Sequence, residues 1–197
     1  MNHTEDIKAI REMMEKSVKF QSLSGLSLVV AGVFAVAGAV FAYFFLLRDP
    51  SITSYNRTQE TLILLADALA VLALASGVIS LCSWQKAKRN NTTVFNRVTM
   101  RAAYNLLVPL AAGGVFSLVL LYRGEVAYVA SITLIFYGLA LINASKFTVG
   151  ELHTLGLCEV VVGLLAAIYL YHGIYWWTLG FGVLHIVFGI IMHFKYK

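Results

Sequence analysis

Long runs of apolar residues dominate the chain, and polar residues are confined to short stretches between them. The hydrocarbon core of a bilayer is about 30 Å thick, and a helix crosses it with roughly 20 mostly apolar residues. Six such runs are present, at residues 23–47, 60–83, 102–122, 126–145, 152–171 and 175–194. We therefore predict an all-α fold, a polytopic membrane helix bundle of six transmembrane helices that occupies residues 22–197.

The composition excludes a soluble fold. The 197 residues are 59% apolar and only 13% charged, whereas a soluble domain carries about 25% charged residues. So few charges cannot cover a surface that faces water, and the lipid bilayer is the first partner that we expect. The two cysteines exclude a disulfide framework.

Residues 1–21 have a different pattern, with charged residues interleaved among apolar ones at helical intervals. Glu12 with Lys16, and Glu15 with Lys19, are spaced four residues apart, which stabilises a helix through opposite charges on one face. We predict an amphipathic cytoplasmic helix here. It either lies on the membrane surface or against the bundle, or it docks a cytoplasmic protein partner.

The basic residues predict the orientation, because Lys and Arg in short loops stay on the cytoplasmic side. Three of them flank the bundle on one side: Arg48, Arg57 and Arg123. Twelve lie on the other: Lys8, Arg11, Lys16, Lys19, Lys86, Lys88, Arg89, Arg97, Arg101, Lys146, Lys195 and Lys197. We expect a multi-pass protein of the cell inner (plasma) membrane with both termini cytoplasmic. Anionic lipid accounts for the basic loop between residues 86 and 101, so no nucleic acid partner is predicted.

Small residues form a face along the second predicted span. They alternate by four and three positions, which places them on one side of a helix: Ala66, Ala70, Ala73, Gly77 and Ser80. Such a face allows another membrane helix to approach closely. We expect it to pack against the first span, with a homo-oligomer interface as the alternative.

The spans are expected to form three helical hairpins. The segment at residues 119–124 resembles that at 168–173, and each closes a predicted hairpin. Chance similarity between apolar segments is the alternative explanation.

Ionisable residues inside the predicted spans are the candidates for chemistry, because a charge at a helix centre costs roughly 2.5–3.5 kcal/mol. They are Asp67, Glu159 and His185. Glu159 and His185 lie at similar depth on consecutive antiparallel spans, so we expect them to form a pair. Pro109 removes a backbone donor and frees a carbonyl near Asn105, and we expect both residues to line the same site.

Three interpretations of this pair stay open. A carboxylate beside an imidazole can relay protons or handle a cation; alternatively, Glu159 is protonated and only bridges two helices. Metal binding is the third and least favoured, because His153 lies six positions before Glu159 and faces away from it on a helix. No spacing typical of a metal or cofactor site occurs, so none is predicted.

Two short motifs carry a resemblance to known proteins. Ser24-Gly25-Leu26 opens the first span, and Gly150-Glu151 followed by Leu155-Gly156-Leu157 opens the fifth. Together with the six-span arrangement of the whole chain, they resemble an uncharacterised family of small six-span inner-membrane proteins of bacteria. The resemblance implies a six-helix membrane protein and assigns no activity or functional residue.

The sequence leads to two hypotheses about function. Since motifs of soluble enzymes such as a P-loop or a GxSxG elbow are absent, the first is a non-enzymatic scaffold, accessory or regulatory membrane protein. The second is a small transporter or channel for protons, a small cation or a neutral solute, built around Glu159 and His185.

Overall fold

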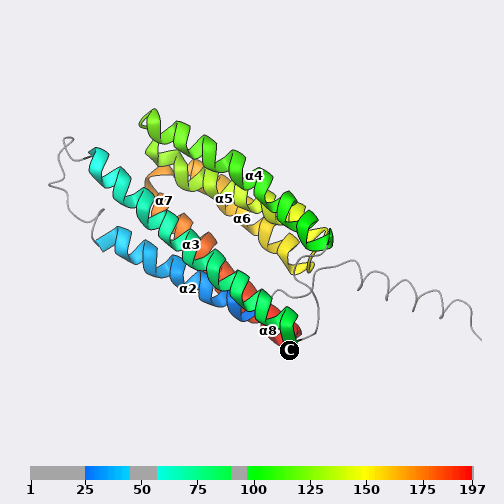
Figure 1. Ribbon diagram of the computed structural model, residues 1–197. Coiled ribbons are helices and arrows are strands. Elements are labelled where there is room, and N and C mark those ends of the chain that lie inside the picture. Colours follow the sequence, from blue (N-terminus) through cyan, green and yellow to red (C-terminus); the bar gives the residue numbers. More distant parts are fainter. Residues whose placement is uncertain (1–24, 45–56, 90–96, 197) are drawn as a thin grey trace, which may run out of the picture.

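The computed structural model describes residues 25–44, 57–89 and 97–196 (Figure 1). The amphipathic helix predicted at residues 1–21 lies outside the described residues. Within them, six helical segments are long and apolar enough to cross a membrane, one for each predicted span. The protein is therefore a multi-pass integral membrane protein.

The described helices follow one another along the chain. They are α2 (Gly25–Ala42), α3 (Arg57–Arg89), α4 (Arg97–Tyr122), η2 (Val126–Tyr128), α5 (Val129–Ser145), α6 (Glu151–Ile168), η3 (Leu170–His172), α7 (Gly173–Trp177), η4 (Thr178–Leu184) and α8 (His185–Lys195). Both η2 and η3 are 3-10 turns, whereas η4 is a π-helix. The last three elements run on without a break and make up the sixth membrane span.

The ends of α3 and α4 differ from the ends of the apolar runs. α3 has 33 residues, which at 1.5 Å each gives roughly 50 Å, more than a bilayer core. Its last turn contains Lys86, Lys88 and Arg89, which the negative end of the helix dipole favours. α4 likewise begins at Arg97, so much of the predicted basic loop is helical. Hydropathy marks where a helix leaves lipid, not where it ends.

The helices form two groups that lie side by side (Figure 1). In one, α2 packs against α3 and α8; in the other, α5 packs between α4 and α6. The sixth span links them, because α7 packs against α5 while η4 contacts both α2 and α6. The most extensive interface joins α5 to α6, which belong to different predicted hairpins, so the three-hairpin pattern stays a prediction.

Glycines bring two antiparallel helix pairs into backbone contact. A Cβ atom on Gly156 of α6 would lie only 2.7 Å from the carbonyl oxygen of Gly138 on α5, and one on Gly25 of α2 would lie 2.5 Å from that of Gly189 on α8. Close approach of this kind is how membrane helices gain packing energy without a hydrophobic driving force. The start of α2 therefore lies beside the end of α8.

Polar side chains join α6 to α8 at this end of the bundle. The carboxylate of Glu151, at the start of α6, accepts hydrogen bonds from the Lys195 ammonium and from the Tyr196 hydroxyl, the latter at 2.7 Å. Burial raises the pKa of the Tyr196 phenol, and the hydrogen bond to the carboxylate raises it further. The end of α8 is thereby tied to the start of α6.

The predicted packing of the small-residue face of α3 against the first span is wrong. All five of its members are exposed: Ala66, Ala70, Ala73, Gly77 and Ser80. A Cβ atom on Gly77 would meet nothing within 4 Å, whereas one on Gly38 of α2 would clash with Val71 and lie 3.3 Å from the Asp67 carboxylate. α2 thus supplies the small residue at this contact and α3 the larger ones. The homo-oligomer alternative for the exposed face stays a prediction.

Candidate functional site

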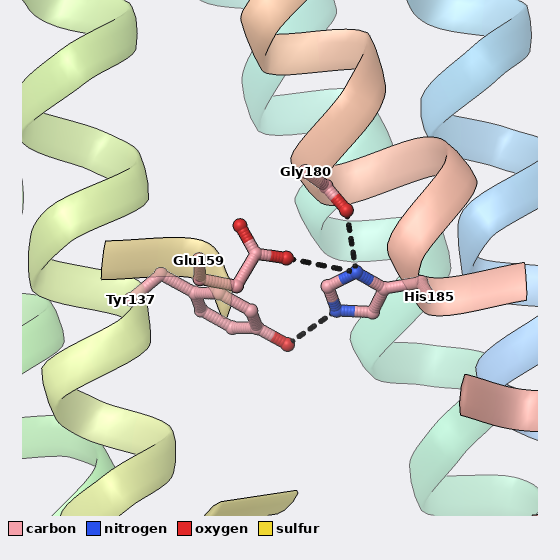
Figure 2. Close-up of polar contacts among 4 residues, drawn as sticks. All are labelled: Tyr137, Glu159, Gly180 and His185. Atoms are coloured by element: carbon pink, nitrogen blue, oxygen red, sulfur yellow. Dashed lines mark hydrogen bonds and ion pairs between the residues drawn. The ribbon is translucent and has the colours of Figure 1, made fainter. Parts of the chain in front are cut away.

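The two deepest ionisable residues of the described chain meet between the two helix groups. Glu159 of α6 is 0% exposed and His185, the first residue of α8, is 4% exposed. Their Oε1 and Nδ1 atoms lie 3.3 Å apart, and the His185 ring points from its helix toward the carboxylate (Figure 2). The structure thus brings together the pair that equal depth on consecutive spans predicts.

A third residue, Tyr137 of α5, completes the site from the opposite side of the imidazole. Its hydroxyl oxygen lies 2.7 Å from Nε2 of His185 (Figure 2). Sequence reasoning missed Tyr137. The available signal was a hydroxyl-bearing aromatic in the middle of an apolar span, because a buried tyrosine usually needs a partner for its hydroxyl.

The π-helix η4 supplies the fourth group, the carbonyl oxygen of Gly180. This oxygen lies 3.1 Å from Nδ1 of His185, five residues further on. Gly180 also makes room for the carboxylate, since a Cβ atom there would lie 2.5 Å from Oε2 of Glu159 and would overlap the Leu134 side chain. π-helical turns inside helices often occur at functional sites, and this one aims a carbonyl at a side chain.

These contacts define where the imidazole carries its proton. Nδ1 lies between the Gly180 carbonyl and the Glu159 carboxyl group, and because the carbonyl can only accept, Nδ1 carries hydrogen. In the neutral ring Nε2 then accepts from the Tyr137 hydroxyl. Neither oxygen of Glu159 receives a well-formed hydrogen bond from the described residues, because the Nδ1 hydrogen is shared with Gly180. A proton on the carboxyl would remove this uncompensated buried charge.

Apolar layers enclose the site at both ends. Leu134 and Val162 lie about one turn from Tyr137 and Glu159 toward one end of the bundle, and Leu141 and Leu155 lie about one turn away toward the other. Leu134 and Leu155 are both 0% exposed. The site is therefore a polar layer inside an apolar interior.

Aromatic packing holds the rings of the site in place. The Phe181 ring of η4 lies 5.0 Å from that of Tyr137 and 6.1 Å from that of His185, centroid to centroid. The rings of Tyr137 and His185 lie 5.3 Å apart. Contacts of this kind fix ring orientation as well as adding packing energy.

The other predicted site residues lie elsewhere. Asp67 is on α3, which packs against α2, and its carboxylate lies beside Gly38. The Asn105 amide donates to the Arg101 carbonyl one turn earlier in α4, at 2.8 Å, and Pro109 lies in the same helix. Because α5 separates α4 from α6, the prediction that Asn105 and Pro109 line the site of Glu159 is wrong. In the part of the chain that the structure describes, no three His, Cys, Asp or Glu side chains could hold a metal ion together.

No protein-family model, curated protein or solved structure matches the chain. The resemblance to small six-span inner-membrane proteins of bacteria accordingly stays an expectation.

Proposed function

We propose that this membrane protein binds protons within the bilayer and passes them across it through Glu159 and His185. The observation that carries the proposal is the 3.3 Å contact between a carboxylate and an imidazole that are 0% and 4% exposed. Ionisable groups in the middle of a membrane are costly and commonly mark proton or ion pathways. Packing alone does not explain why two ionisable side chains are buried here in place of apolar ones.

The chemistry of the pair suits protons better than other small cations. Hard metal cations take six or more oxygen ligands in most protein sites. Here the Nδ1 atom of His185 lies between the Gly180 carbonyl oxygen and Oε1 of Glu159 and occupies the space that a cation would need. A proton needs only a donor and an acceptor, and an imidazole serves as both. Nδ1 can give its hydrogen to Glu159 and recover it again.

Proton flux into proteoliposomes tests the proposal. We expect the purified protein, reconstituted with an internal pH dye, to acidify the lumen under an imposed potential, and Glu159→Gln to abolish this flux. The amide keeps the shape of the side chain but has no titratable proton. Asp67→Asn is the matched control, because it removes the other intramembrane acid at a distance from the site. Flux equal to that of empty vesicles from pH 5 to 8 would refute the proposal.

The orientation that we propose places both termini in the cytoplasm, in a bacterial inner membrane. The start of α2 lies beside the end of α8, so both ends of the described chain are on one side. The end of α3 and the start of α4, which carry basic residues, are expected on this same side. The positive-inside rule supports a cytoplasmic location for them.

A second candidate function is that of a non-enzymatic accessory or regulatory protein, and the tight packing around Glu159 favours it. Leu134 and the carboxylate both pack so closely against Gly180 that even a methyl group there would overlap them. In this case residues 1–21 and the basic loop would bind a cytoplasmic protein. A soluble protein that co-purifies in mild detergent, and is lost when residues 1–21 are deleted, would support this function if wild-type vesicles show no flux.

A further inference from the structure

The two nitrogens of the His185 ring face different partners. Nδ1 faces the Glu159 carboxylate at 3.3 Å, and both of these residues are almost completely buried. A proton cannot reach the carboxylate directly from outside, because Leu134 and Leu155, both 0% exposed, lie about one turn to either side. The other ring nitrogen, Nε2, points away from Glu159, and the Tyr137 hydroxyl occupies the position beside it at 2.7 Å.

We propose that Tyr137 is a relay residue that loads and unloads the proton site. The inference rests on the proposed function and extends it, since it names the group through which the buried pair exchanges protons. The geometry that carries it is a row of proton-donating and proton-accepting atoms from the Tyr137 hydroxyl through the His185 ring to Glu159. The hydroxyl is hydrogen-bonded to Nε2 at 2.7 Å, and Nδ1 lies in ion-pair contact with Oε1 at 3.3 Å.

Loading proceeds by three proton transfers that leave the phenol and the imidazole neutral. A hydronium ion gives a proton to the Tyr137 oxygen and becomes water, while the tyrosine O–H gives its own proton to Nε2. Nδ1 gives its proton to the Glu159 carboxylate. The products are neutral tyrosine, imidazole with its hydrogen on Nε2, and a protonated Glu159, so one proton enters and no electrons move. The same transfers in reverse unload the site.

The surroundings hold the relay ready for this exchange. Phe181 contacts the rings of both Tyr137 and His185, which keeps the hydroxyl facing Nε2. The Gly180 carbonyl holds hydrogen on Nδ1 in the unloaded state, which leaves the Nε2 lone pair free to accept. Without that carbonyl the ring could adopt the other tautomer, in which Nε2 has no lone pair to offer the hydroxyl.

Replacing the hydroxyl tests the relay in the same proteoliposomes. We expect Tyr137→Phe to slow proton flux at least tenfold, in keeping with the loss of a positioned acid and base. Tyr104→Phe is the matched control, because Tyr104 is 70% exposed on α4, and it should leave the flux unchanged. Flux at the wild-type rate in Tyr137→Phe, when Glu159→Gln abolishes flux, would overturn the relay and leave the proposed function standing.

A second substitution separates relay from packing. Replacing Tyr137 with 4-fluorophenylalanine fills the space of the hydroxyl and keeps the ring contacts, but this residue has no proton to transfer. The relay predicts that it is as slow as Tyr137→Phe, whereas 3-fluorotyrosine, which retains the hydroxyl, restores flux. Wild-type flux with 4-fluorophenylalanine would show that Tyr137 only fills space, and would overturn the inference. If Glu159→Gln leaves the flux unchanged, the proposed function itself fails.

Discussion

Two glycine-to-alanine substitutions should change stability in opposite directions. In Gly156→Ala the new methyl group would lie 2.7 Å from the Gly138 carbonyl oxygen and 3.0 Å from the backbone nitrogen of Ile142. Carbon normally keeps about 3.5–4.0 Å from other heavy atoms. Backbone atoms cannot move aside without their helix, so α5 and α6 must separate. In Gly77→Ala the methyl group meets nothing within 4 Å.

The expected magnitudes follow from packing and helix propensity. Overpacking costs about 1–3 kcal/mol, and alanine recovers up to about 1 kcal/mol because it favours a helix more than glycine does. Gly156→Ala should therefore destabilise the protein by roughly 1–2 kcal/mol. Gly77→Ala has only the second effect and should stabilise it by about 0.5–1 kcal/mol.

Thermal unfolding in a mild detergent, followed by tryptophan fluorescence, measures both changes. At about 2–4 °C per kcal/mol for a chain of this size, Gly156→Ala should lower Tm by roughly 2–8 °C and Gly77→Ala should raise it by about 1–4 °C. A rise in Tm for both variants would refute the reasoning, because it would mean that α5 and α6 do not meet at Gly138 and Gly156.

Two further predictions concern the exposed face of α3 and the orientation. Ala73→Leu should leave Tm within about 1 °C of the wild type, as expected for a surface substitution, and Gly77→Leu should raise it about as much as Gly77→Ala, because leucine also favours a helix over glycine and both positions are exposed; a smaller molar mass in detergent would instead reveal a homo-oligomer broken by the larger side chain. Reporter fusions at Lys197 should report the cytoplasm and those within residues 51–59 the outside, and a reversed result would contradict the distribution of basic residues.

Hydropathy was enough to predict the six spans, because each run of apolar residues must become a helix in lipid. Depth along these helices was enough to predict that Glu159 meets His185. It could not predict Tyr137, which reaches the site through the glycine contact between α5 and α6, nor the π-helix that aims the Gly180 carbonyl. Both depend on how helices rotate against one another, which the hydrophobic pattern of a nearly all-apolar span does not specify.

The small residues of α3 are a second example of packing that the sequence of one helix does not determine. A face of alanine and glycine permits close contact, but it does not create one. Where α2 already presents Gly38, the neighbouring helix fits better with Val71 and Asp67 opposite. Which of two helices contributes the small residue is a property of the pair, so it cannot be deduced from either helix alone.

The contact of α2 with α8 has a consequence for biosynthesis. A ribosome delivers these helices in order, so α4, α5 and α6 can assemble in the membrane while α2 still lacks the partner for its Gly25. The Glu159 carboxyl stays without its imidazole until His185 has been inserted. Chains that stall before η4 would expose an unpaired acid to lipid, a feature that membrane quality control could distinguish from the finished bundle. The contact between Glu159 and His185 would then form only with the insertion of the sixth span.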